Sequence, residues 1–272
     1  MPLKNPRPLR AARPPAAFTL MEILVVVAII LVLAAIAFPV YSTVLRRSHK
    51  ITAINNMRQI TTALVTYTTQ NDGDFPDENI PAGSTWTNAA NPGMGAKVWY
   101  NSLPRLLGRK GVGDYPNTEA GHTSYYTKEN LLFLPGALYP PPAKRLLKPH
   151  FALALNTKLQ RISKTTKLKS KAKMSQITHP SRTVAFFEVG MLGEPKAMAI
   201  QAAYDDGGDP KSYGKSFVTR YGGRGVVTFL DGHAEDLEAK RILNDTGRVK
   251  VPPETDILWA PDSDIDPNVR LP

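Results

Sequence analysis

Residues 18–41 read FTLMEILVVVAIILVLAAIAFPVY, and this stretch decides the fold. The eighteen residues from Ile23 to Val40 carry no charge, and with Phe18 to Met21 the apolar stretch exceeds twenty residues. At a rise of about 1.5 Å per residue, a helix of this length reaches roughly 30 Å, the thickness of the hydrocarbon core of a bilayer. We therefore expect a transmembrane helix over residues 18–41.

The residues that flank this helix predict its orientation. Residues 1–17 contain four basic side chains and no acidic one. Basic residues beside a span stay in the cytoplasm, so the rest of the chain should lie outside a bacterial inner membrane. A secretory signal peptide would be followed by a small-residue cleavage site, but Phe38, Pro39, Val40 and Tyr41 end this run. We expect a single-pass protein with a cytoplasmic N-terminus.

Glu22 interrupts the apolar stretch near its start. A lone carboxylate inside a bilayer costs on the order of 2 to 3 kcal/mol or more, so such residues are usually functional. A carboxylate at the headgroup boundary could also be tolerated without any role. Position alone leaves both interpretations open.

The surrounding segment AAFTLMEILVVVAIILVLAAIAFPVY resembles the prepilin leader junction of type IV pilins and type II secretion pseudopilins. The matching positions are a small residue, an aromatic residue and a Thr-Leu-x-Glu sequence, which are here Ala17, Phe18, Thr19, Leu20 and Glu22. Ala17 stands where the family usually has glycine. The resemblance implies cleavage between Ala17 and Phe18 by a membrane aspartyl prepilin peptidase, followed by methylation of the new Phe18 amine.

The same resemblance implies roles for Glu22 and Pro39. Cleavage would give Phe18 a cationic amine, and a nearby carboxylate favours that charged form while offsetting its own desolvation. In the family, the glutamate of an incoming subunit is thought to pair with the amine of its neighbour, so Glu22 would be an assembly residue. Pro39 matches the proline that kinks the helix.

The family also implies partners and a location. The partners would be prepilin peptidase, an inner-membrane assembly platform with its ATPase, other pilin-like subunits and membrane lipid. The protein would reside in the inner membrane and reach the cell surface after assembly.

The helix is expected to continue beyond the membrane over residues 42–70. No Gly or Pro occurs from Tyr41 to Gln70, and apolar residues recur at steps of three and four: Ile51, Ile54, Met57, Ile60, Leu64 and Tyr67. This spacing places one apolar stripe against a globular head. The sequence Asn71-Asp72-Gly73-Asp74 should end the helix. Two separate helices are the alternative, because the segment after Tyr41 contains several weak helix formers.

The head, residues 71–272, is predicted to be α+β, with an antiparallel sheet packed on the long helix. Thr183 to Glu188 and Gly225 to Leu230 are runs of β-branched and aromatic residues typical of strands, and Ala197 to Tyr204 is a weaker candidate. Asp231 and Gly232 between GVVTFL and HAEDLE predict a hairpin with a two-residue turn.

Parts of the head resemble a second pilin-like family, the prepilin-type processing-associated proteins named for a histidine, nine residues and then Asp-Gly. The resemblance covers INNMRQITTALVTYTTQNDGDFP, residues 179–188 and residues 221–238. Tyr221 occupies the position of the defining histidine, so no role of that histidine can be carried over. Asp231 and Gly232 stand where the family has them.

The chain shows no catalytic constellation and no implied cofactor. It has no cysteine, which excludes disulfides, thiolate metal sites and cysteine nucleophiles, and its five histidines are scattered. Asp72, Asp74 and Asp77 could bind calcium, but turn formation also explains them. We expect a protein that is not an enzyme and holds no metal.

A basic segment, residues 144–173, holds ten Lys or Arg and no acidic residue. Its candidates for an anionic ligand are Lys164, Lys167, Lys169, Lys171 and Lys173. The alternating lysines could bind an anionic polymer such as a glycan or DNA, or could form a solvated face.

Two functions follow from these features. The first is a structural subunit, a minor pilin or pseudopilin, of a type IV pilus or type II secretion pseudopilus. The alternative is a membrane-tethered envelope module that binds an anionic ligand.

Overall fold

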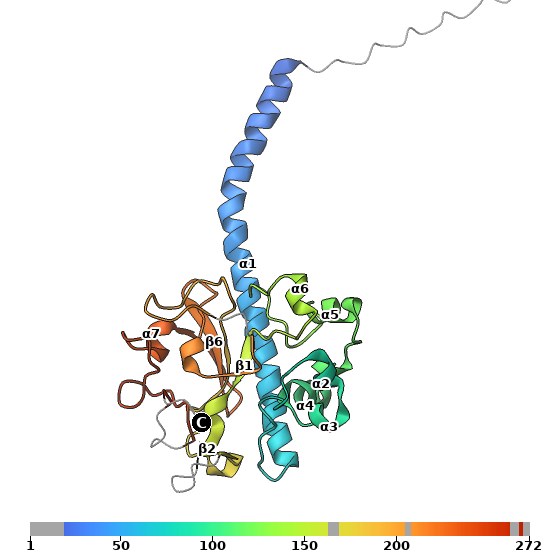
Figure 1. Ribbon diagram of the computed structural model, residues 1–272. Coiled ribbons are helices and arrows are strands. Elements are labelled where there is room, and N and C mark those ends of the chain that lie inside the picture. The colour runs from blue at the N-terminus through green and yellow to red at the C-terminus, as the bar shows by residue number, and fades with distance from the viewer. Residues whose placement is uncertain (1–18, 163–168, 205–207, 262–266, 269–272) are drawn as a thin grey trace, which may run out of the picture. The chain divides into compact units, whose positions relative to one another are not determined.

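The computed structural model describes residues 19–162, 169–204, 208–261 and 267–268 (Figure 1). The chain divides into two compact units, residues 1–45 and residues 46–272, the second of which is called the head below. The expected leader, residues 1–17, and Phe18 lie outside the described residues.

The helix α1 runs from Leu20 to Gln70 without interruption and continues through Pro39. The prediction of a single helix rather than two is therefore confirmed. In the first unit, every large apolar side chain between Leu20 and Leu45 is exposed. This part of α1 is long and apolar enough to cross a membrane.

Within the head, α1 buries one stripe of side chains. Ala53, Met57, Ile60 and Leu64 are at most 1 % exposed. Ile51, which the sequence placed on this stripe, is instead 58 % exposed. Two successive steps of three residues, from Ile51 to Met57, drift by about 120° around the helix, so Ala53 takes the buried position one turn before Met57.

The helix ends at the predicted turn. Asp72 and Gly73 have φ angles of 52° and 83°, and the Gly73 amide donates to the Thr68 carbonyl at 2.8 Å. Glycine favours this left-handed conformation at a helix C-terminus because it has no Cβ.

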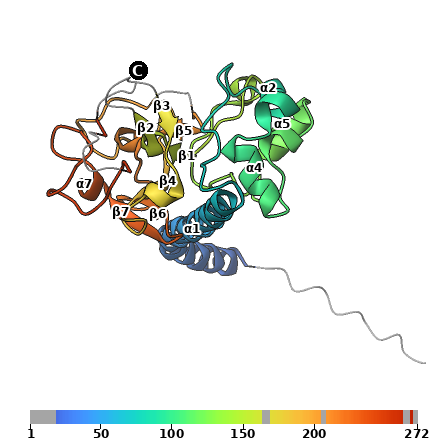
Figure 2. The same cartoon turned by 90° about the horizontal axis from the view of Figure 1, so that it is seen from below.

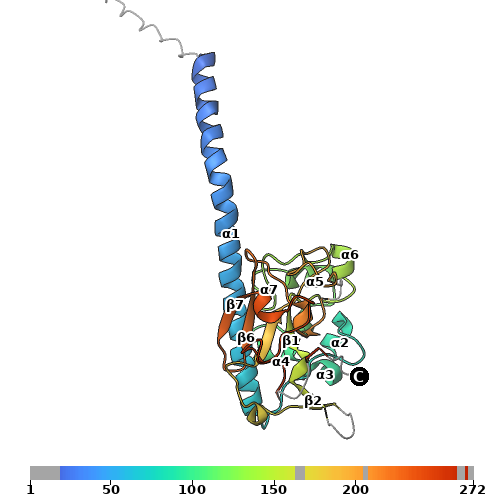
Figure 3. The same cartoon turned by 90° about the vertical axis from the view of Figure 1, so that its left-hand side faces the viewer.

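A five-stranded sheet, in the order β5-β1-β4-β6-β7, packs on α1 (Figure 3). The bounds are β1 Leu153–Asn156, β4 Val184–Glu188, β5 Lys211–Ser212, β6 Arg224–Phe229 and β7 Ala234–Glu238. The expected antiparallel pairing holds for β1–β4, β4–β6 and β6–β7. The short strand β5 adds a parallel edge to β1, which makes the sheet mixed.

The sheet separates two apolar clusters. The register of β4 and β6 shifts between Val184 and Phe186, and this bulge places Ala185 and Phe186 together on the α1 side. Val184 and Phe187 face the other cluster, which is covered by residues 239–260. On the α1 side, the hydroxyls of Thr61 and Thr228 lie 2.7 Å apart in a buried hydrogen bond.

The hairpin between β6 and β7 has three loop residues instead of the predicted two. The Phe229 amide donates to His233, and the Gly232 amide donates to Phe229, so Leu230, Asp231 and Gly232 form the loop. Gly232 has a φ of 95°, whereas Asp231 does not adopt positive φ. The extra residue, Leu230, is 1 % exposed and packs into the core, which explains the longer loop.

A group of short helices lies beside the sheet (Figure 2). It comprises α2 Trp86–Ala90, α3 Pro92–Gly95, α4 Trp99–Leu106, α5 Glu119–Tyr125 and α6 Pro142–Arg145. The fully buried Trp99 joins this group to the sheet, because its ring lies 5.8 Å from Phe151 and 5.0 Å from Phe186. None of these helices was predicted from the sequence.

The remaining elements are short. They are β2 Gln160–Ile162, β3 Lys169–Lys171, α7 Ala239–Ile242 and the 3-10 helices η1 Val112–Asp114, η2 Thr157–Leu159, η3 Met174–Gln176 and η4 Gly214–Ser216. The predicted strand at Ala197 to Tyr204 is wrong. Its described residues form turns, in which the Gln201 amide donates to the Met198 carbonyl, and Ile200 is 57 % exposed.

Replacing Met57 by Ala should destabilise the head by about 2 to 5 kcal/mol, because the change opens a cavity between α1 and the sheet. Met94→Ala is the matched control: its side chain is 47 % exposed, and we expect a change within about 0.5 kcal/mol. Urea titration of the full chain in detergent micelles, followed by tryptophan fluorescence, measures both. Equal midpoints for the two variants would contradict the packing described for α1.

Candidate functional site

The first turn of α1 is closed by two side chains of the predicted junction. The Thr19 amide and hydroxyl donate to Oε2 of Glu22 at 2.8 and 2.9 Å, and the Glu22 amide donates to the Thr19 hydroxyl at 3.2 Å. Thr19 immediately precedes Leu20, the first helical residue, and Glu22 is three residues after Thr19. This reciprocal arrangement is a capping box.

The capping box determines where the carboxylate of Glu22 lies. It is held back toward the Phe18–Thr19 peptide rather than extended along the helix, because it accepts the Thr19 amide. A helix N-terminus stabilises negative charge through its free amides and its dipole. The carboxylate is therefore fixed at the Thr19 amide, at the N-terminal end of α1.

Residues 13–38 match the family of the prokaryotic N-terminal methylation motif. The N-terminal region of the chain is therefore type IV pilin-like. Its motif is that of proteins processed by prepilin peptidase, and the match includes Ala17, Phe18, Thr19 and Glu22. No curated protein and no solved structure matches the chain.

The other residues predicted to act in the N-terminal region differ in whether the family match includes them and whether the structure describes them. Ala17 and Phe18 belong to the matched motif but lie outside the described residues. Pro39 follows the matched range directly and lies inside α1, and its kink stays a prediction. The second resemblance, over residues 179–188 and 221–238, also stays a prediction.

Two of the three stretches of that second resemblance, residues 179–188 and 221–238, meet at a buried carboxylate. Glu188, at the end of β4, is fully buried, and its Oε1 accepts hydrogen bonds from Tyr221 Oη at 2.9 Å and Arg220 Nη1 at 3.0 Å. Its Oε2 accepts the Val226 amide of β6 at 2.8 Å. Burial raises the pKa of Glu188, and the charge of Arg220 opposes this shift. Tyr221 therefore serves as a hydrogen-bond donor to Glu188.

Arg220 extends this network to a second carboxylate. Its Nε and Nη2 donate to the two oxygens of Glu194 at 2.8 and 2.7 Å, and Nη2 also donates to the Val189 carbonyl at 2.6 Å. Glu194 in turn accepts the amides of Leu138 and Met191. The side chains of Arg220 and Glu194 are 4 % and 5 % exposed.

The network of Glu188, Glu194, Arg220 and Tyr221 joins segments of the head and is not arranged as a reactive site. We call these four residues the clamp. Each of the four carboxylate oxygens accepts at least one hydrogen bond, and the group joins β4, β6 and the loops at Leu138 and Met191. A satisfied, water-excluded ion pair favours a unique arrangement of the segments it joins. This network was not predicted from the sequence, in which the one local indication is a glutamate at the end of the apolar run VAFFE.

Arg220→Met should destabilise the protein by about 3 to 5 kcal/mol, because the change leaves Glu188 and Glu194 buried without their counter-charge. Arg224→Met is the matched control. Arg224 pairs with Asp236 and Glu238 while 40 % exposed, and we expect its loss to cost at most about 1 kcal/mol. Thermal unfolding followed by circular dichroism compares the two variants. A larger loss for the Arg224 variant would contradict the assignment of the clamp.

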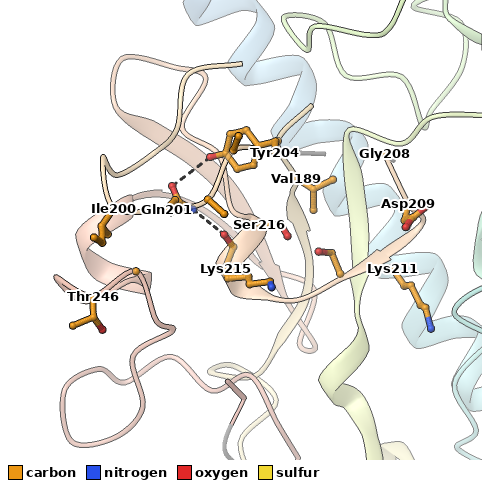
Figure 4. A pocket seen from close by; sticks show the side chains of 15 residues that line it. Val189, Ile200, Gln201, Tyr204, Gly208, Asp209, Lys211, Lys215, Ser216 and Thr246 are labelled. Carbon is orange, nitrogen blue, oxygen red and sulfur yellow. Dashed lines mark hydrogen bonds between the residues drawn. The ribbon is translucent and has the colours of Figure 1, made fainter. Parts of the chain in front are cut away.

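The head also contains an open cavity of about 310 Å³ (Figure 4). Several of its polar side chains are already engaged within the protein: Gln201 Nε2 donates to the Lys215 carbonyl at 2.8 Å, and Lys211 pairs with Glu78 at 2.7 Å. Lys215 lies over the ring of Tyr213, 4.8 Å from its centroid. We assign no ligand to this cavity.

Of the candidate residues for an anionic ligand, Lys173 is the one whose side chain the structure describes. Lys164 and Lys167 lie outside the described residues, and Lys169 and Lys171 are in β3, which pairs with β2 in a separate two-stranded sheet. The ammonium of Lys173 is 3.0 Å from the Asp72 carbonyl and 3.5 Å from Oδ1 of Asp74, so it is engaged at the C-terminus of α1. The binding of an anionic polymer stays a prediction.

The calcium alternative at Asp72, Asp74 and Asp77 gains no support. Asp74 pairs with Lys173, and Asp72 adopts the left-handed conformation of the turn. Within the described ranges, no group of three or more His, Asp or Glu side chains could hold a metal ion.

Proposed function

We propose that this protein is a structural subunit, a minor pilin or pseudopilin, of a type IV pilus or a type II secretion pseudopilus. The observation that carries the proposal is the capping box of Thr19 and Glu22 at the start of an uncovered apolar helix. Prepilin peptidase removes the leader, and an inner-membrane platform with its ATPase draws the subunit out of the membrane.

The exposed apolar surface of α1 supports assembly through this helix. From Leu20 to Leu45 the large apolar side chains have no protein cover, and a soluble protein rarely exposes so large a continuous patch. Lipid tails cover the surface while the subunit waits in the membrane. In a filament, the same surface is covered by the helices of neighbouring subunits.

The carboxylate of Glu22 fixes the axial position of one subunit's helix relative to its neighbours. An uncompensated carboxylate among apolar helices costs on the order of 2 to 3 kcal/mol or more, whereas a cationic amine within a few ångströms offsets that cost. Cleavage after Ala17 supplies such an amine at Phe18 of a neighbouring subunit. A subunit shifted along the filament axis would leave both charges unpaired, so the pair selects one axial position.

Glu22→Ala and Glu22→Gln together separate the two roles of this residue. Glutamine at this position still completes a capping box but carries no charge. We expect both variants to insert and to lose the leader normally, and both to be absent from sheared surface filaments or isolated pseudopili. Immunoblotting of membrane and sheared fractions measures this. Assembly of the glutamine variant at the level of the unmodified protein would contradict the charge-pairing role.

Mass spectrometry of the mature N-terminus tests processing at Ala17. We expect a chain that begins with methylated Phe18, and an Ala17→Gly variant that is processed at least as completely. The same preparation separates the filament subunit from a membrane-tethered module, because a subunit appears in the sheared fraction and a tethered module stays with the inner membrane. A chain that keeps residues 1–17 in cells containing the peptidase would contradict the proposal.

A further inference from the structure

Three leucines on the head are unusually exposed. Leu138, Leu147 and Leu192 have exposed fractions of 54 %, 73 % and 52 %. They lie in loops and next to α6, away from the stripe of α1 that packs on the sheet. Single exposed leucines need no explanation, but a group of them on one surface indicates a contact.

The three leucines belong to one region, at the end of the head where α1 enters it. A methyl group placed on Gly193, next to Leu192, would lie 3.2 Å from Cδ2 of Leu138. A methyl group placed on Gly136 would lie 3.2 Å from Nδ1 of His49, in the first turn of α1 within the head.

Leu147 joins the same region through α6. The guanidinium of Arg145, the last residue of α6, lies 6.0 Å from the centroid of the Tyr139 ring, and Tyr139 follows Leu138 directly. Figures 1 and 3 both place α6 at the end of the head where α1 enters it. We call Leu138, Leu147 and Leu192, with the basic residues described next, the leucine surface.

Basic side chains occur close to these leucines in the chain and at the first turn of α1 within the head. Arg46 and Arg47 belong to that turn, Lys196 follows Leu192 by four residues, and all three are exposed. From Asn130 to Tyr204 the sequence contains only two acidic residues, Glu188 and Glu194, and both are buried in the clamp with Arg220. At the first turn of α1 within the head, Asp236 pairs with Lys50 at 2.9 Å. Exposed leucines with exposed basic residues are the combination that binds an anionic lipid surface.

The chain itself keeps this surface close to a membrane. Only four residues separate Tyr41, at the end of the expected span, from Arg46, where the head begins. Even a fully extended chain of this length reaches only about 18 Å. Arg46 and Arg47 are therefore held within roughly 20 Å of the end of the expected span, whatever the orientation of the head.

We propose that the leucine surface docks on the anionic phospholipid headgroups of that bilayer. The three leucines enter the interfacial layer, and Arg46, Arg47 and Lys196 lie against lipid phosphates. Docking keeps the head bound to the bilayer before assembly. The head must dissociate from the lipid before the subunit enters a filament. The proposal adds a membrane-bound resting state to the assembly function and does not depend on which filament is built.

The experiment uses the full chain reconstituted at one copy per vesicle. The sequence has no cysteine, so a single introduced cysteine carries one polarity-sensitive fluorophore. The labelled positions are Leu138→Cys, Leu147→Cys and Leu192→Cys, and the matched control is Met94→Cys, which is 47 % exposed on α3 at the other end of the head (Figures 1 and 3). Vesicles contain either phosphatidylethanolamine with phosphatidylglycerol or phosphatidylcholine alone, with a nitroxide quencher on the lipid.

In vesicles with phosphatidylglycerol, we expect blue-shifted and lipid-quenched emission at the three leucine positions and aqueous emission at Met94. The double variant Arg46→Glu, Arg47→Glu should lower the ratio of docked to undocked heads by roughly tenfold or more. Arg58→Glu is the charge control, because Arg58 is exposed on the same helix farther from its entry into the head, and we expect it to leave the ratio unchanged.

Three results would overturn the proposal. One is emission at the leucine positions equal to that at Met94. Another is equal docking in phosphatidylcholine, because the basic residues would then contribute nothing. The third is a blue shift that appears only at many copies per vesicle, which would assign the surface to a second copy of the chain. Because no assembly machinery is present, failure here leaves the filament proposal intact, and failure of Glu22 variants to block assembly leaves docking intact.

Discussion

The contact between α1 and the five-stranded sheet is the interaction on which the rest of the head depends. Met57, Ile60 and Leu64 are fully buried, and they share one core with Phe186 and Val226 of the sheet. This core also receives Trp99, through which the group of short helices is joined to the sheet. The same helix therefore provides the apolar surface of the first unit and one wall of the core of the second.

The parts of the fold that depend on local sequence could be predicted, and those that depend on distant partners could not. The apolar helix was predicted from the uncharged run of eighteen residues from Ile23 to Val40. The end of α1 was predicted from the adjacent residues Asp72 and Gly73. The third loop residue of the hairpin, Leu230, is explained by the core it enters, which the sequence does not display. The helices between Trp86 and Arg145 are at most eight residues long, so they are too short to show a helical period.

The candidate site also has a part that depends on local sequence and a part that depends on distant residues. The junction at Thr19 and Glu22 is a local motif and was recognised from the sequence, although the capping box itself was not predicted. In the clamp, Arg220 pairs with Glu194 and Glu188, which are 26 and 32 positions away in the chain. No spacing pattern in the sequence predicts such pairs. The two glutamates also contrast in function. Glu188 is fully satisfied inside the protein, whereas we assign the partner of Glu22 to another subunit.

The order of the strands has a consequence for folding. The strand β6 lies inside the sheet, between β4 and β7, yet it comes from residues 224–229, late in the chain. The face of α1 with Met57 and Ile60 is among the first parts of the head to be synthesised, and its burial is completed only when β6 has also been synthesised. The contacts that complete the core are thus of long sequence separation, which slows folding. The core of the head therefore stays incomplete until residues 224–229 have been added to the chain.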